Sequence, residues 1–220
     1  MRRACSCQPG PGRGGRSEPK LPDVRRLVFL ARHGETEWNR EGRWQGHTDV
    51  ELNETGLGQA RALAELLRAH AVSRIHTSDL RRARQTAETV AAALGVSELV
   101  VDRALRERSF GIFEGLTREE CQVRHPELWA RYRANPRDVP PGAEGHDVLA
   151  ARMLEAVLRA SKPEEASRGP VLIVSHGGSI RALLAHLTGT MPPPLENVAV
   201  FRAVATVDGL EEIALLPSAP

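Results

Sequence analysis

Short apolar runs alternate along the chain with longer segments in which apolar residues recur at helical spacing. Two runs, residues 27–31 and 170–174, are almost wholly apolar, which is typical of strands buried on both faces of a sheet. Further strands are expected at residues 75–77, 99–101, 196–206 and 211–215, and helices at residues 55–69, 79–94, 117–121, 127–132, 147–160 and 178–187. This alternation predicts an α/β fold, a three-layer sandwich whose mostly parallel central sheet has helices on both faces.

Local signals indicate where some of these elements begin and end. Asn53 or Thr55 is the candidate cap of the first long helix, and Gly95 is the expected stop of the second. Residues 196–206 alternate polar and apolar positions, with residues 211–215 as a candidate hairpin partner. Such a strand could form a sheet edge that pairs between subunits, so a monomer and a homodimer both stay open.

Composition separates a polar tail from the rest of the chain. Residues 1–23 are rich in Gly, Pro, Arg and Ser and have no apolar periodicity, so we expect them to be disordered and residues 24–216 to form one domain. A secretory signal is excluded because no hydrophobic stretch follows the first arginines. A transit peptide stays open, although the Pro and Gly content opposes an amphipathic helix.

Charge and cysteine content exclude several classes of protein. Residues 1–26 are basic while the whole chain carries only +2, so the remainder is slightly acidic and offers no basic surface for nucleic acid. No apolar stretch approaches the roughly 20 residues that span a bilayer, so no membrane partner is expected. Cys5, Cys7 and Cys121 show neither a disulfide framework nor zinc-ligand spacing, which favours free thiols and a cytoplasmic location.

The two most apolar strands end in the same way. The first strand is followed by Arg32-His33 and then a glycine. The second is followed by His176-Gly177 and then a second glycine. Open parallel sheets place their ligands at the carboxyl ends of the strands. If the two strands are neighbours, two imidazoles meet at one edge of the sheet, beside two glycine-containing turns whose backbone can approach a ligand closely.

Two further loops supply a second arginine and a carboxylate. Arg82 follows the short strand at residues 75–77, and Glu107 follows the strand at residues 99–101. Arginine forks match phosphate oxygens, and a helix N-terminus such as the one expected near Gly177 favours anions. Two arginines, two histidines and one glutamate at a single sheet edge therefore suit a phosphoryl group.

Four motifs in this chain resemble those of one family. Residues 32–39, 78–87, 105–107 and 174–178 are similar, in their order and at strand ends, to the signature of the histidine phosphatase superfamily, in its phosphoglycerate-mutase-like branch. The resemblance covers nearly all of residues 26–206. It implies the phosphoglycerate-mutase-like fold and an enzyme that acts on a small phosphorylated substrate.

The resemblance also implies a role for each matching side chain. His33 would be the nucleophile that forms a phosphohistidine, and Glu107 would protonate the leaving alkoxide and then activate water. The residues implied to bind the phosphoryl group are Arg32, Arg82, His176, Asn39 and Gly177. No metal or cofactor is required, because arginine and histidine neutralise the phosphoryl charge. The same cations should disfavour protonation of His33.

Other histidine, arginine and tryptophan side chains are not expected to take part in the chemistry. Those expected to form structural hydrogen bonds are His47, His70, His125, His146 and His186. Those expected to be solvated or ion-paired are Arg81, Arg84, Arg106 and Arg108. Those expected to pack rather than to hold substrate are Trp38 and Trp44.

Hydrolysis is favoured over two alternatives. Residues 110–115 (F-G-I-F-E-G) resemble the hydrolytic members, and residues 117–142 are short for a lid that excludes water. The alternatives are a phosphoglycerate mutase that uses the same phosphohistidine and a catalytically silent phosphate-binding module, which the intact motifs disfavour. Residues 141–146 depart from the P-G-G-E-S pattern common among phosphatases, which puts a substrate contact from this loop in doubt although Glu144 is retained. The sequence does not choose among phosphorylated substrates.

Overall fold

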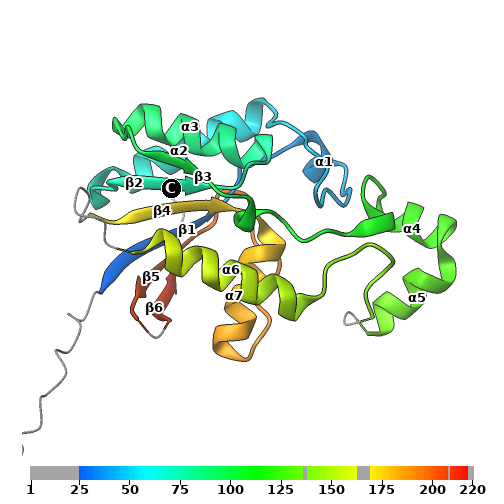
Figure 1. Cartoon of the computed structure of the whole chain (residues 1–220). Helices are drawn as coiled ribbons and strands as arrows, with labels where there is room; N and C mark the ends of the chain where they lie inside the picture. Colours follow the sequence, from blue (N-terminus) through cyan, green and yellow to red (C-terminus); the bar gives the residue numbers. More distant parts are fainter. Residues whose placement is uncertain (1–24, 136–137, 163–168, 208, 218–220) are drawn as a thin grey trace, which may run out of the picture.

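One six-stranded sheet forms the centre of the protein. The computed structural model describes residues 25–135, 138–162, 169–207 and 209–217, and the strand order is β3-β2-β4-β1-β5-β6 (Figure 1). The strands are β1 (Arg26–Arg32), β2 (Arg74–Thr77), β3 (Leu99–Val101), β4 (Val171–Ser175), β5 (Val200–Ala205) and β6 (Leu210–Leu215). The first four strands in this order are parallel to one another, β5 is antiparallel to β1, and β6 is antiparallel to β5, which confirms the prediction of a mostly parallel sheet.

Helices cover both faces of this sheet. The helices are α1 (Glu37–Arg40), α2 (Glu54–Leu67), α3 (Arg81–Leu94), α4 (Arg118–Arg124), α5 (Pro126–Ala134), α6 (His146–Ala160) and α7 (Gly177–Thr188), with 3₁₀ turns at Arg68–His70, Arg103–Leu105 and Gly111–Phe113. One apolar cluster joins α2 and α3 to one face, and a second joins α6 and α7 to the other. The predicted three-layer sandwich is therefore confirmed.

The apolar run of β1 supplies both clusters because successive side chains of a strand point to opposite faces. Val28 and Leu30 pack in the cluster of α6 and α7, whereas Phe29 and Ala31 pack in the cluster of α2 and α3. All four side chains are fully buried. Burying a large apolar side chain contributes about 1.5–3 kcal/mol, so the run secures β1 at the centre of the sheet.

The pairing of β1 with β4 places the two histidine motifs side by side. The strands are parallel neighbours in which Ala31 pairs with Val174 and Arg32 pairs with Ser175. The register continues one residue further, since the His33 backbone N–H donates to the Ser175 carbonyl at 3.0 Å. The expectation that the two most apolar strands are neighbours is confirmed, and both chain segments leave the sheet at the same edge.

A separate small layer lies beyond the carboxyl ends of the parallel strands, where α4 and α5 stand apart from the sheet (Figure 1). Its core contains Phe113, Leu116, Cys121 and Trp129. Cys121 is a buried free cysteine in α4, and its burial raises the pKa of the thiol to about 11. This layer overhangs the edge of the sheet at which the sequence motifs meet.

The hypothesis that residues 196–206 form an edge strand is wrong. The strand β5 lies between β1 and β6, and the sheet edges within the described residues are β3 and β6. It also begins only at Val200, because Val198 adopts a left-handed backbone conformation with φ of +54° that interrupts the extended chain. The hairpin of β5 with β6 is confirmed, since the two strands pair antiparallel.

Cap residues act as the sequence indicated. The Asn53 side chain accepts a hydrogen bond from the Gly56 N–H and caps α2, and Gly95 ends α3 in the left-handed conformation. Within the described ranges, no helix combines the length and the apolar character needed to cross a bilayer. The disordered tail expected at residues 1–23 lies outside the described residues.

Candidate active site

A cavity of about 200 Å³ opens at the carboxyl edge of the sheet. Residues from β1, α1, α3, α7 and the loops between them line it. Its lining residues include Arg32, His33, Asn39, Gln45, Arg82, Glu107, Gly177 and Arg181. The sequence-predicted site residues therefore come together here, except that His176 is fully buried and is not among the lining residues.

One nitrogen of the His33 ring is hydrogen-bonded to the backbone, and the other is free to act as a nucleophile. Nδ1 lies 2.6 Å from the Gly34 carbonyl oxygen, which can only accept, so Nδ1 carries the proton and Nε2 keeps its lone pair. The backbone is held as well, because Asn197 donates its side-chain N–H to the His33 carbonyl at 3.1 Å. The side chain is 2% exposed. This arrangement presents a fixed, unprotonated Nε2.

Burial and two guanidinium groups keep His33 neutral. Burial lowers its pKa well below 6.5, and the nearby charges of Arg82 and Arg32 lower the pKa further. The expectation that cations disfavour its protonation is confirmed, although burial is the larger cause. The pKa of His176 is lowered for the same reasons, and the two rings lie 5.1 Å apart.

Arg82 is a fully buried cation aimed by backbone carbonyls. Its two terminal nitrogens donate to the Thr48 carbonyl at 2.9 Å and the Gly46 carbonyl at 2.8 Å. Its Nε is buried without a hydrogen-bond partner. Burial lowers its pKa to about 10, so the guanidinium stays protonated at neutral pH.

Several buried donors around this cavity lack partners. Arg32 donates to the Leu195 carbonyl, but its Nε is buried without a partner, as is the Nε of Arg82. Neither ring nitrogen of His176 has a partner either. Unsatisfied buried donors are costly, so such a cluster beside a cavity indicates a ligand that satisfies them, and two of the groups are cations. The arrangement suits an anion.

Glu107 is held at the N-terminus of α7. Its Oε1 accepts from the backbone N–H groups of Arg108 at 2.8 Å and Ser179 at 2.9 Å, and its Oε2 accepts from the Gly178 N–H at 3.0 Å. A Cβ atom at Gly178 would lie 2.5 Å from Oε1, so this approach requires glycine. The sequence predicts that the amides of this helix end bind the ligand, but in the described structure the N–H groups of Gly178 and Ser179 bind the Glu107 carboxylate instead.

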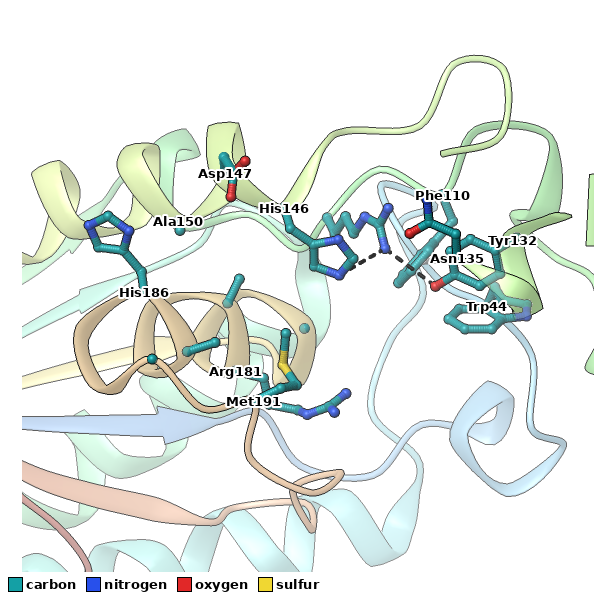
Figure 2. A pocket seen from close by; sticks show the side chains of 15 residues that line it. Trp44, Phe110, Tyr132, Asn135, His146, Asp147, Ala150, Arg181, His186 and Met191 are labelled. Atoms are coloured by element: carbon teal, nitrogen blue, oxygen red, sulfur yellow. Dashed lines mark hydrogen bonds between the residues drawn. The ribbon is translucent and has the colours of Figure 1, made fainter. Parts of the chain in front are cut away.

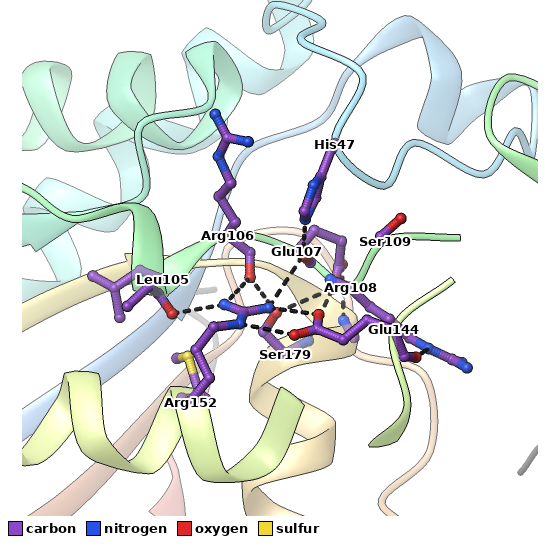
Figure 3. A network of polar contacts seen from close by, with 12 residues as sticks. His47, Leu105, Arg106, Glu107, Arg108, Ser109, Glu144, Arg152 and Ser179 are labelled. Atoms are coloured by element: carbon purple, nitrogen blue, oxygen red, sulfur yellow. Dashed lines mark hydrogen bonds and ion pairs between the residues drawn. The ribbon is translucent and has the colours of Figure 1, made fainter. Parts of the chain in front are cut away.

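The backbone that carries Glu107 is fixed by Arg152 of α6 (Figure 3). The guanidinium donates to the carbonyls of Ala104 at 2.7 Å and Arg106 at 3.1 Å and forms a two-pronged ion pair with Glu144 at 3.0 and 2.7 Å. From the other side, His47 donates from Nε2 to the Glu107 carbonyl at 2.9 Å, as expected of a structural histidine. The Glu144 carboxylate thus supports the Glu107 loop.

If Glu107 is the proton donor that the family resemblance implies, replacing Arg152 by methionine is expected to lower kcat by about 10- to 100-fold with little change in KM, because a displaced acid group weakens proton transfer more than binding. Steady-state kinetics on an alkyl phosphate checks this. Arg159→Met is the matched control, since Arg159 lies on the same helix and pairs with Asp102 at the surface at 2.7 Å. Equal kinetic effects of the two substitutions would contradict the positioning role of Arg152.

Asn39 and Gly177 also line the cavity. The Oδ1 atom of Asn39 accepts from the Thr36 backbone N–H at 3.1 Å and from the Asn197 side chain at 3.3 Å, which turns its amide nitrogen away from both. Gly177 packs against the Arg32 side chain, where a Cβ would lie 3.3 Å from Nε. Asn197 and Arg152 hold site residues in place, and the sequence motifs do not predict either of them.

Arg108 departs from its expectation. Arg106 pairs with Asp79, with both contacts at 2.7 Å, but Arg108 is 3% exposed and has no ion pair with a carboxylate in the described part of the chain. It lines a second cavity of about 610 Å³ together with Tyr132 and His146 (Figure 2). The sequence pattern does not predict this, because the residues that close over the side chain lie 24 and 38 positions further along the chain. Trp44 packs on Phe110 as expected, with ring centroids 4.5 Å apart, yet it lines both cavities.

No group of three or more His, Cys, Asp or Glu side chains among the described residues is arranged to hold a metal ion. The ionisable groups of the smaller cavity are instead mainly cationic. A neutral imidazole, two guanidinium groups and a fixed carboxylate can bind a phosphoryl group, attack it and move a proton to or from an adjacent oxygen.

Comparison with known proteins agrees with this geometry. The family model of the histidine phosphatase superfamily (branch 1) matches residues 28–211. Phosphoglycerate mutase-like protein 4 of Arabidopsis thaliana is 41% identical over 71% of this chain and 68% of its own length, and a metal-independent phosphoserine phosphatase of the same plant is 37% identical over 73% and 68%. A mycobacterial glucosyl-3-phosphoglycerate phosphatase, solved with VO3, has a TM-score of 0.75 and 32% identity over 89% of this chain and 100% of its own. The chain belongs to the histidine phosphatase superfamily, and it is a phosphatase of that superfamily.

Proposed function

We propose that the chain hydrolyses a small phosphorylated metabolite, without a metal ion, through a phosphohistidine on His33. The observation that carries the proposal is the cluster of buried, unpartnered nitrogens of Arg32, Arg82 and His176 beside the available Nε2 of His33. Three oxygens of a phosphoryl group would satisfy these donors while its phosphorus faces the nucleophile. A chelator should leave hydrolysis of p-nitrophenyl phosphate unchanged, and loss of activity on chelation would contradict the proposal.

In the first half-reaction, the Nε2 lone pair of His33 forms a bond to phosphorus while the bond from phosphorus to the leaving oxygen breaks. Arg32 and Arg82 stabilise the charge on the equatorial oxygens. Glu107 donates the proton that the leaving alkoxide needs. Oε2 is the atom suited to carry it, because it accepts one hydrogen bond whereas Oε1 accepts two from backbone N–H groups and one from the Ser179 hydroxyl.

In the second half-reaction, water attacks phosphorus and the bond to Nε2 breaks. Glu107, now a carboxylate, takes a proton from that water. Inorganic phosphate leaves and the neutral imidazole of His33 is restored. The Gly34 carbonyl holds the Nδ1 proton throughout, so the same nitrogen is presented in every turnover.

The lowered pKa of His33 predicts how the ring titrates. Because the folded-state pKa lies well below 6.5, the neutral form with a proton on Nδ1 should persist as the pH falls from 7.5 through 6.5. Imidazole ¹⁵N NMR on labelled protein checks this, with the signal assigned by its loss in His33→Ala. The chain unfolded in urea supplies the reference midpoint. A His33 signal that titrates near 6.5, or a proton on Nε2, would contradict the assignment.

Hydrolysis and phosphoryl transfer to a second hydroxyl share the first half-reaction, so a product assay must separate them. We propose hydrolysis, supported by the F-G-I-F-E-G segment and by the likeness to two phosphatases. Release of inorganic phosphate from 3-phosphoglycerate should exceed formation of 2-phosphoglycerate, which an enolase-coupled assay measures. Faster isomerisation than hydrolysis would favour a mutase. The substrates in the relatives' names, phosphoserine and glucosyl-3-phosphoglycerate, are the first to test.

A further inference from the structure

We propose that the substrate's leaving group occupies the cavity of about 610 Å³ and carries a second anionic group that Arg108 binds. This inference rests on the proposed function and names the chemical class of its substrate, a phosphate monoester with an additional carboxylate or phosphate. It is carried by the burial and contacts of Arg108 and by the continuity of the two cavities.

The two cavities meet at a shared border. Trp44, Phe110, Gly178 and Arg181 line both of them. A phosphoryl group beside His33 in the smaller cavity would therefore direct its leaving group past this border into the larger one. The volume of the larger cavity is sufficient for an organic group of several carbon atoms, since small-molecule sites commonly occupy about 300–1,000 Å³.

The Arg108 guanidinium is buried without a counter-charge. Its Nε donates to the Glu144 carbonyl at 2.7 Å, whereas Nη1 makes only long contacts of 3.3 Å to the Tyr132 hydroxyl and to His146 Nε2. Its Nη2 is buried without a partner. A buried charge is costly unless an opposite charge accompanies it. The neighbouring Glu144 carboxylate does not serve, because Arg152 holds both of its oxygens.

The aromatic walls around Arg108 partly compensate its charge, and the side chain lines the cavity. Its guanidinium carbon lies 5.5 Å from the Phe110 ring centroid and 5.8 Å from that of Tyr132, distances suited to cation–π contact. The Tyr132 hydroxyl and His146 Nε2 each lie 3.3 Å from its Nη1. Arg181 brings a second guanidinium to the border of the cavities, with its Nε on the Pro192 carbonyl at 2.9 Å.

An anion in the larger cavity would supply the missing counter-charge. Arg108 can exchange its two 3.3 Å contacts for short, charge-assisted hydrogen bonds to a carboxylate or phosphate. A neutral leaving group would pack against the aromatic walls but leave the guanidinium uncompensated. The structure therefore favours substrates with two anionic groups, one in the smaller cavity and one in the larger cavity, with Arg181 between them.

Two substrate pairs test the proposal and separate its two chemical sources. In the first pair, 3-phosphoglycerate differs from glycerol 3-phosphate by a carboxylate in place of a hydroxymethyl group. In the second, fructose 1,6-bisphosphate differs from fructose 6-phosphate by a second phosphate. The wild-type chain is expected to prefer the more anionic member of at least one pair by about 10- to 100-fold in kcat/KM. The pair that shows the preference identifies the anion.

Arg108→Met should reduce that preference to within about threefold, and Arg108→Lys, which keeps the charge, should retain an intermediate preference. Arg133→Met is the control with an unchanged preference, because Arg133 is exposed and stacks on Trp129, away from both cavities. Calorimetric binding of the same four compounds to His33→Ala gives a second readout that needs no turnover. A wild-type preference below threefold in both pairs overturns the inference even if no Arg108 variant folds.

The outcomes distinguish this inference from the proposed function. If p-nitrophenyl phosphate is hydrolysed in a His33-dependent way while neither pair shows a preference, the subsite is refuted and the phosphatase mechanism stands. If no phosphate is released from any substrate, the mechanism fails, and the calorimetric preference still decides the subsite. A preference that survives Arg108→Met assigns the anion to other residues and overturns the role of Arg108.

Discussion

His33→Ala is expected to lower kcat/KM for p-nitrophenyl phosphate by on the order of 10⁴-fold or more, because it removes the nucleophile of the proposed first half-reaction. The loss should exceed that from any binding residue, since the phosphoryl pocket cannot replace a covalent step. Release of p-nitrophenol over hours, corrected for the uncatalysed rate, measures it. Thermal denaturation should show that the variant remains folded.

His70→Gln is the matched control for this substitution. His70 lies in the 3₁₀ turn before β2, at the opposite end of the sheet, and its ring packs against Phe29 with centroids 4.9 Å apart. Its replacement should leave kcat/KM within about twofold, as is usual for changes remote from a site. Activity of His33→Ala comparable with that of His70→Gln would remove His33 from the mechanism.

Glu107→Gln is expected to have the second largest effect, and the effect should depend on the leaving group. General acid catalysis contributes about 10²–10⁴-fold where the leaving oxygen needs a proton. Glycerol 3-phosphate, with an alkoxide leaving group, should therefore lose about 10³-fold in kcat/KM. p-Nitrophenolate leaves without a proton, so its first half-reaction should lose much less.

The same variant should separate the two half-reactions with p-nitrophenyl phosphate. Because water then lacks its base, phosphohistidine should accumulate and p-nitrophenol should appear in a burst of up to one equivalent per chain. Stopped-flow absorbance measures the burst. Glu88→Gln, an exposed carboxylate of α3 that pairs with Arg84, is the control that should behave like the wild type. Equal losses for the alkyl and aryl esters would contradict the proton-transfer role of Glu107.

The sequence predicted the assembly of the site because its members lie at strand ends. Once β1 and β4 are identified by their apolar runs, the parallel register alone places His33 beside the segment of His176. Arg82 and Glu107 follow strands of the same sheet, so the topology brings them to the same edge. These short sequence patterns are sufficient to place the site residues together, because the carboxyl ends of the parallel strands all lie at the same edge of the sheet.

Residues that act across elements were harder to find. Arg152 lies three residues after Leu149 and four before Ala156, so helical spacing puts it on the buried face of α6, a signal that was present in the sequence. Asn197 had no such pattern, because a loop far along the chain carries it to His33. The burial of Arg108 depends on how α5 and α6 close around it, which local sequence does not encode.

The most direct test of the mechanism is the site of the phosphoryl group during turnover. The chain is mixed with p-nitrophenyl phosphate, quenched in base within milliseconds and digested, because phosphohistidine survives alkali but not acid. Peptide mass spectrometry should find one phosphoryl group on the peptide that contains His33, and none on that peptide in His33→Ala. A peptide that stays unmodified in Glu107→Gln while hydrolysis proceeds, or a phosphoryl group on another residue, would contradict the phosphohistidine mechanism.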